Sequence, residues 1–188
     1  MSVSTNDFKN GMTLDLDGTL FQVIEFQHVK PGKGGAFVRT KLRNVKTGAV
    51  IERTFNAGVK VDQAIVERRG FQYLYPDGDE FVFMDLQTYD QIHVPTTLIG
   101  EGANYLVEGE QAQVALHENT PISVDLPASM VLKVVTCDPG AKGDTRTGAL
   151  KPATLETGVV VNVPLFVEEG ESIKVDTRSG EYIERVKR

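Results

Sequence analysis

The sequence has little of the chemistry that stabilises secreted proteins or builds metal centres. Its single cysteine, Cys137, excludes an internal disulfide and leaves too few thiolates for a structural zinc site. The histidines (His28, His93 and His117) are scattered without metal-ligand spacing, so we expect no metal and no cofactor. No apolar run approaches the ~20 residues of a membrane helix, and residues 1–10 lack the apolar core of a signal peptide. We therefore expect a cytoplasmic protein with no membrane partner.

Helical periodicity is also scarce, and the best helical candidate, residues 61–69, is short and could equally be a strand. Short β-type runs separated by turn residues dominate instead, and Pro76-Asp77-Gly78-Asp79 between two aromatic-rich runs predicts a hairpin. This pattern predicts an all-β protein built from small barrels. The predicted strands are 21–29, 36–45, 50–55, 71–75, 80–85, 104–107, 111–116, 122–126, 130–137, 159–167 and 172–176.

The net charge of -6 argues at first against a nucleic-acid partner, but the charges are distributed unevenly. Residues 1–62 carry 9 basic and 6 acidic side chains, residues 63–126 carry 2 and 11, and residues 127–188 carry 9 of each. A polyanion would therefore be met by the first third of the chain. The charge change near residue 63 and the Leu126-Pro127 step predict three domains: 1–63, 64–126 and 127–188.

The basic glycine-rich segment Lys30-Pro31-Gly32-Lys33-Gly34-Gly35 lies between two alternating runs and is expected to be a hairpin tip. Pro31 restricts φ, and the glycines permit close backbone approach to a partner. In the following strand, a period of two places Phe37, Arg39, Lys41 and Arg43 on one face, which suits phosphate contact and stacking. From residue types alone, an ordinary flexible hairpin beside a solvated basic face explains the pattern equally well.

A second motif, Asp15-Leu16-Asp17-Gly18-Thr19, matches the Asp-x-Asp-Gly-Thr signature of aspartate-nucleophile phosphatases. In that chemistry the first aspartate attacks phosphate and both carboxylates hold Mg²⁺. The context differs, because a strand-like run follows the motif where the signature opens a helical segment. We therefore interpret Asp17-Gly18 as a turn between two strands and expect no enzyme.

A long polar segment, residues 139–148, is predicted to be an exposed loop. Asp144, Thr145 and Arg146 could hydrogen-bond to bases or phosphates. By pattern alone, a mobile loop is the plainer interpretation.

The chain resembles bacterial elongation factor P over its whole length. The resemblance rests on long collinear stretches: residues 25–40 (EFQHVKPGKGGAFVRT), 72–75 with 81–85 (QYLY and FVFMD), and 142–145, 151–158 and 163–166 (KGDT, KPATLETG and VPLF). It implies an SH3-like (KOW-like) N-terminal domain followed by two OB-type domains.

The resemblance also implies a function. Family members bind the ribosome between the P and E sites, contact both subunits, and relieve stalling at consecutive prolines. Their N-terminal tip reaches the acceptor end of the P-site peptidyl-tRNA, and Lys33 aligns with the tip residue. In many members that residue is a lysine extended by modification, and in others an arginine carrying a sugar. A lysine-modifying enzyme is therefore an expected partner, and whether Lys33 is extended or used bare stays open.

The resemblance extends to the third domain. Gly143, Asp144 and Thr145 match a loop that reaches the small subunit and the mRNA near the E-site codon, and Arg146 would add a phosphate contact. Arg39, Lys41 and Arg43 would contact the RNA backbone, and we expect a monomer. The alternative function is an OB-type single-stranded RNA-binding or chaperone module.

Overall fold

The computed structural model of the chain describes residues 1–139 and 148–187. Strands dominate, and helical structure in the described residues is confined to short segments: η1 (Thr5–Asp7), α1 (Thr96–Ile99) and η2 (Gly100–Tyr105). The predicted all-β class is confirmed. No helix in the described ranges has the length and apolar character to span a bilayer. The strands are β1 (Ser2–Ser4), β2 (Thr13–Leu16), β3 (Thr19–Val29), β4 (Phe37–Asn44), β5 (Val50–Asn56), β6 (Lys60–Gln63), β7 (Glu67–Asp77), β8 (Glu80–Asp85), β9 (Gln91–Pro95), β10 (Gln111–His117), β11 (Thr120–Asp125), β12 (Ser129–Cys137), β13 (Leu150–Leu155), β14 (Val160–Pro164), β15 (Ser172–Asp176) and β16 (Tyr182–Val186).

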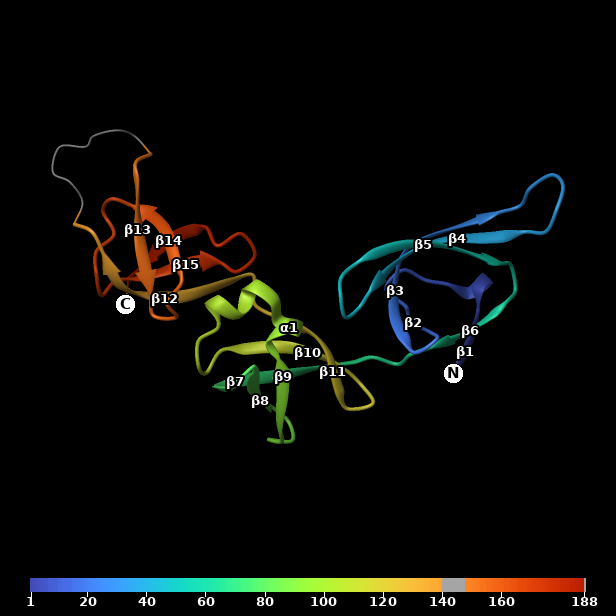
Figure 1. Cartoon of the computed structure of the whole chain (residues 1–188), viewed down its shortest axis with the longest axis horizontal. Helices are drawn as coiled ribbons and strands as arrows, with labels where there is room; N and C mark the ends of the chain where they lie inside the picture. The colour runs from blue at the N-terminus through green and yellow to red at the C-terminus, as the bar shows by residue number, and fades with distance from the viewer. Residues whose placement is uncertain (140–147, 188) are drawn as a thin grey trace. The chain divides into compact units, whose positions relative to one another are not determined.

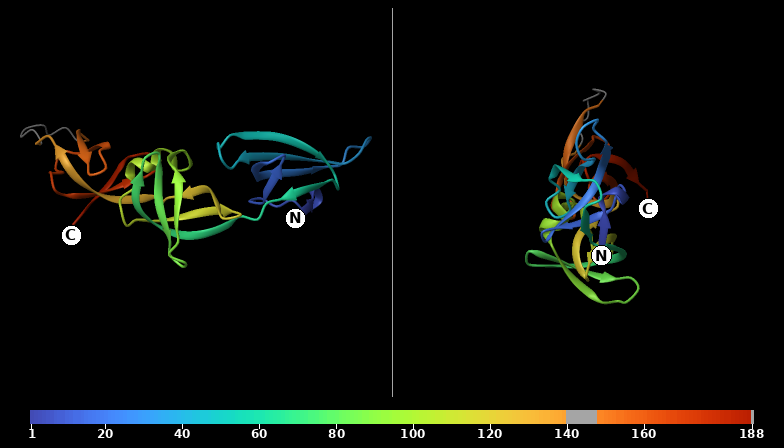
Figure 2. Two further views of the ribbon diagram at one scale, coloured as in Figure 1. Left: turned by 60° about the horizontal axis from the view of Figure 1, so that its bottom comes forward. Right: turned by 90° about the vertical axis from the view of Figure 1, so that its right-hand side faces the viewer.

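The strands form three sheets, each of which is curled (Figures 1 and 2). Their strand orders are β1-β6-β2-β3-β4-β5, β11-β10-β7-β8-β9 and β14-β13-β12-β15-β16. By its contacts the chain divides into two compact units, Met1–Arg68 with Val114–Ser123 and Arg69–Gln113 with Val124–Arg188. The division into domains at residues 63 and 126 stays a prediction.

The second and third sheets share one connectivity, with the first strand of each in the middle between its second and fourth strands. In the third sheet, the edge strands β14 and β16 also contact one another, which closes the sheet toward a barrel. This is the arrangement expected of a five-stranded OB-type barrel. Its core is aliphatic and fully buried: Leu132, Val134, Ala153, Leu155, Val161, Val163, Val167, Ile173 and Val175.

The first sheet encloses its own core because its strands alternate apolar and polar residues. In β4, Val38 and Leu42 are fully buried, whereas the residues between them point outward. Thr40 shares the buried face, and its hydroxyl donates to the carbonyl oxygen of Arg53 at 2.6 Å, which offsets the cost of burying a polar group. The cluster comprises Phe8, Leu14, Leu16, Val23, Val38, Leu42 and Phe55.

One loop design recurs three times, once in each sheet, and we call its copies the capped loops: residues 44–49, 85–90 and 176–181. The Oδ1 atom of the first residue (Asn44, Asp85 or Asp176) accepts the backbone N–H groups of the third and fourth residues at 2.8–3.2 Å. The hydroxyl of the fourth residue (Thr47, Thr88 or Ser179) accepts the N–H of the sixth at 3.3 Å. The fifth residue has a positive φ. The short polar side chains therefore satisfy the backbone of each tight connection.

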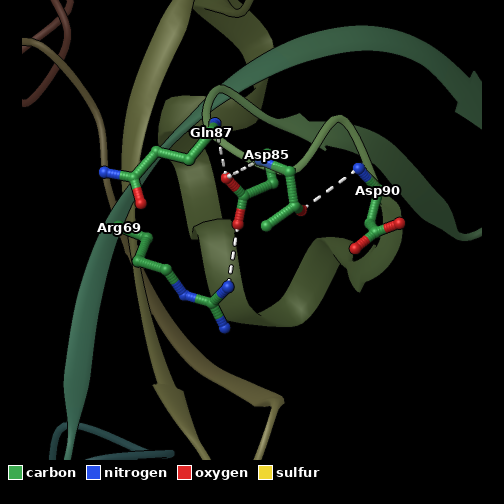
Figure 3. A network of polar contacts seen from close by, with 5 residues as sticks. Arg69, Asp85, Gln87 and Asp90 are labelled. Atoms are coloured by element: carbon green, nitrogen blue, oxygen red, sulfur yellow. Dashed lines mark hydrogen bonds and ion pairs between the residues drawn. The ribbon is translucent and has the colours of Figure 1, made fainter.

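The middle capped loop is also stabilised by an ion pair with β7 (Figure 3). Asp85 is buried, and its Oδ2 lies 2.9 Å from Nη1 of Arg69, which is partly buried on β7. The Gln87 and Thr88 amides and the Arg69 guanidinium outweigh the cost of burial and hold the pKa of Asp85 below its ordinary value. The Asp85 carboxylate thus joins the loop to β7 of the same sheet.

Most predicted strands are present, and the differences have local causes. The turn at Asp17-Gly18 is confirmed: it joins β2 to β3, with φ of 55° and 83° at its two residues. The hairpin at 76–79 is confirmed between β7 and β8. The strand predicted at 104–107 is wrong, because the chain forms η2 there and Leu106 is buried beyond its end. Strands β1, β6, β9, β13 and β16 were missed. β1 and β6 pair with strands that are distant in the sequence, whereas β9, β13 and β16 each pair with a strand adjacent in the sequence.

Candidate nucleic-acid interface

The predicted tip loop is the end of a long antiparallel hairpin. β3 and β4 pair up to Val29 and Phe37, and the hairpin extends beyond the rest of its sheet (Figure 1). Beside β4, the Ala57 N–H donates to the carbonyl oxygen of Ala36 at 2.9 Å, so hydrogen bonding to the neighbouring chain continues to the last residue before the loop. Lys30–Gly35 are all exposed. The free part of the hairpin therefore coincides with the basic segment.

Lys33 lies at the centre of this loop between Gly32 and Gly34, and the structure records no ion pair for it within the described residues. A β-carbon built on Gly32 or Gly35 would meet no atom within 4 Å. The centre of the loop thus presents the Lys33 ammonium group on a thin backbone, with a glycine on either side of it. Such a tip can enter a narrow cavity in a partner, which a loop of larger side chains could not do.

The loop glycines differ in what they require of the backbone, and this yields a testable prediction. Gly34 has φ of +104°, a region that disfavours a β-carbon, whereas Gly32 and Gly35 do not have positive φ. We expect Gly34→Ala to lower the free energy of unfolding by about 1 kcal/mol. Gly32→Ala should change it by less than about 0.5 kcal/mol. Urea unfolding followed by circular dichroism measures both.

If Gly32→Ala keeps its stability but weakens binding to a partner, the cause is the approach of that partner to the loop backbone. Equal destabilisation by both substitutions would contradict the backbone argument.

The outward face of β4 carries the predicted cations. Arg39, Lys41 and Arg43 are exposed, and they alternate with Val38, Thr40 and Leu42, which are buried. Phe37, expected on the same face, is half-buried at the start of the strand. The alternation predicted from the sequence is therefore confirmed.

Two acidic neighbours on this face escaped the sequence analysis. Lys41 pairs with Glu25 on β3 and with Glu52 on β5, so a carboxylate lies opposite it on both sides. Its Nζ lies 3.1 Å from Oε2 of Glu25, and this hydrogen bond and charge raise the pKa of Lys41 above its ordinary value. For Arg39 and Arg43 the described residues provide no ion pair. The free positive charge of the face is thus concentrated on the two arginines, with Lys41 largely engaged.

The predicted contact residues of the third domain, Gly143, Asp144, Thr145 and Arg146, lie outside the described residues. The segment that leads to them is held at two points. Lys151, a buried lysine on β13, donates from Nζ to the carbonyl oxygen of Asp138 at 2.6 Å. Oε1 of Glu169 accepts the N–H of Cys137 at 3.1 Å. These residues line a cavity of about 590 Å³ at that end of the barrel.

The other sequence candidates take ordinary structural places. Oδ1 of Asp15 accepts the N–H of Gly18 at 2.8 Å, so this carboxylate shapes the turn between β2 and β3. His28 packs edge-on against Phe26, and His93 lies between two carboxylates near a hairpin end. Within the ranges described, no group of three or more potential metal ligands converges.

Three family models match successive parts of the chain. Residues 4–61 match the model of the elongation factor P KOW-like domain, residues 66–124 the elongation factor P OB domain, and residues 130–185 the elongation factor P C-terminal region. The chain belongs to the elongation factor P family. It is therefore a translation elongation factor that associates with the ribosome.

Relatives in this family cover nearly the full chain. An elongation factor P of Acidothermus cellulolyticus is 62% identical over 97% of both chains. That of Frankia casuarinae is 61% identical over 97% of this chain and 98% of its own. A solved structure of eukaryotic translation initiation factor 5A from Methanococcus jannaschii matches 66% of this chain and 93% of its own, with 28% identity and a TM-score of 0.55.

Proposed function

We propose that the protein binds the ribosome between the P and E sites and stimulates peptide-bond formation at consecutive prolines. The observation that carries this proposal is the tip loop Lys30–Gly35, which presents an exposed lysine on a thin backbone in a chain of the elongation factor P family. In this proposal Lys33 contacts the acceptor end of the P-site peptidyl-tRNA.

The physical role of the tip is to hold a substrate in place. Proline is a poor nucleophile with a rigid ring, so prolyl substrates reach attack geometry rarely. Holding the tRNA end reduces the entropy that must be lost before reaction, and the ribosome supplies the chemistry. A lysine ammonium suits this task, since it is a compact cation with three donors for phosphate and ribose oxygens.

The neighbouring groups extend the contact along RNA. Arg39 and Arg43 would bind backbone phosphates on the outward face of β4, where no described carboxylate pairs with them. Gly143, Asp144, Thr145 and Arg146 would contact the small subunit and mRNA near the E-site codon. The exposure of Lys33 also leaves its Nζ accessible to a modifying enzyme that extends the side chain.

The test is a reconstituted translation reaction that synthesises a reporter with three consecutive prolines, with and without the protein. We expect added protein to increase full-length product, and to leave a matched reporter with three alanines unchanged. Equal stalling at the prolines in both reactions would overturn the proposal. Tight binding to free single-stranded oligonucleotides without ribosomes would favour an RNA-chaperone module instead, which the 11 acidic residues within 63–126 disfavour.

A further inference from the structure

The middle capped loop, residues 85–90, differs from the other two at its fifth residue. The fifth residue of each capped loop has a positive φ, which is +75° at Gly48, +72° at Gly180 and +64° at Tyr89. Two copies use glycine, which adopts this conformation without steric cost, and the middle copy uses a bulky aromatic residue. The backbone alone therefore gives no reason for a tyrosine at position 89.

Packing gives no reason either. Tyr89 is 70% exposed, so its ring gains little from burial to offset the unfavourable backbone conformation. The rest of the loop is nevertheless held firmly, because the buried Asp85 caps two of its amides and pairs with Arg69 (Figure 3). Tyr89 is therefore an exposed aromatic residue on a loop that hydrogen bonds and an ion pair hold in place. Strained residues that gain nothing from the fold are typical of binding sites, as are exposed aromatic rings that serve as anchors in interfaces.

The charge of the segment that contains Tyr89 favours a cationic partner. Residues 63–126 carry 11 acidic and 2 basic side chains, so this part of the chain repels phosphates and attracts cationic surfaces. A tyrosine ring binds an arginine or lysine side chain through its face, and its hydroxyl adds a hydrogen bond. We propose that Tyr89 docks the protein on an arginine- or lysine-bearing protein surface of the ribosome. This inference rests on the ribosome association of the proposed function, and it concerns a contact separate from the tip loop.

Site-specific crosslinking tests the class of partner directly. A photoreactive phenylalanine, p-benzoylphenylalanine, replaces Tyr89 in the full chain, which is bound to ribosomes and irradiated. The matched control places the same residue at Tyr75, another exposed tyrosine (48%) on β7. We expect position 89 to yield a ribosomal-protein adduct that position 75 does not. Adducts only with ribosomal RNA would overturn the assignment of partner, and the absence of any adduct at position 89 would overturn the docking itself.

Substitution separates docking from folding, because the two predict opposite effects. We expect Tyr89→Gly to keep or raise the melting temperature, since glycine relieves the positive φ, and to weaken cosedimentation with ribosomes roughly fivefold or more. Tyr89→Phe should retain most of the affinity, since it keeps the ring. A fall in melting temperature with Tyr89→Gly would contradict the strain argument, and unchanged affinity would contradict the docking.

The same measurements distinguish failure of this inference from failure of the proposed function. Cosedimentation does not depend on peptide-bond formation. Wild-type protein that binds ribosomes without relieving stalling would contradict the proposed function alone, and the effect of Tyr89 substitutions on binding would still decide the docking.

Discussion

Replacing Lys33 with alanine is expected to lower synthesis through three consecutive prolines by roughly tenfold or more. Lys33 is exposed at the centre of the tip loop and has no ion pair with any described residue, so its charge is available to a partner. If Lys33 holds the tRNA end in reactive geometry, its loss removes the assistance that the factor gives to peptide-bond formation. The measurement is the rate of full-length reporter formation at saturating protein.

The controls for Lys33→Ala use the same loop and the same fold. The free energy of unfolding should stay within about 0.5 kcal/mol of wild type, because Lys33 is exposed at the tip of the hairpin. Lys30→Ala removes another exposed charge, at the edge of the loop, and should cost much less activity. Equal loss from both substitutions would mean that the loop contributes only its summed charge. Intact mass of protein from its native host shows whether Lys33 is extended, and an unmodified mass with full activity would show that the bare lysine suffices.

The hairpin and its faces were predictable because the signals are local. Glycine and proline marked the tip, and strict alternation from Val38 to Arg43 separated the buried from the exposed face of β4. The Asp17-Gly18 turn was equally local, since its residue types favour the positive φ that both adopt.

The carboxylates beside Lys41 were not predictable, because they depend on register. The pairing of β3 with β4 shifts between Val23 and Glu25, and this irregularity decides which β3 side chain lies opposite Lys41. A shift of one residue moves side chains to the other face of a sheet, and no feature of the local sequence specifies it here. The acidic neighbours therefore emerge only when the strands are assembled.

The capped loops were missed, although their signal is visible in the sequence. Each begins with Asn or Asp and has Thr or Ser at its fourth position: 44–49, 85–90 and 176–181. This spacing is the signature of side chains that bond to their own backbone. What the sequence could not show is that Asp85 alone among the three first residues meets an arginine from β7, since that contact joins residues 16 positions apart.

Asp85→Ala is expected to be among the most destabilising single substitutions in the chain, at about 2–4 kcal/mol. It removes the acceptor of two loop amides and leaves the partly buried Arg69 without its carboxylate partner. Asp85→Asn keeps an acceptor for the amides and loses only the charge, so we expect a smaller loss. Urea unfolding of the three proteins measures the series, and equal losses for both substitutions would assign the whole effect to the ion pair.

The pKa of Asp85 also predicts how stability depends on pH. Its folded-state pKa is lowered, chiefly by the Gln87 and Thr88 amides with Arg69 adding to them, while burial opposes the shift. A carboxyl group with a lowered pKa stabilises the fold fully above its unfolded-state pKa of about 3.9, and this contribution is lost as the pH falls below that value. Wild type and Asp85→Asn should therefore differ in stability near neutral pH and converge as the solution becomes more acidic. Asp176→Asn is the matched control. Asp176 accepts the two equivalent amides of its own loop, those of Arg178 and Ser179, but its charged neighbour is the exposed Arg178. Its difference from wild type should be smaller at neutral pH, and a difference for Asp85→Asn that persists unchanged into acid would show that the carboxylate charge is not what stabilises this loop.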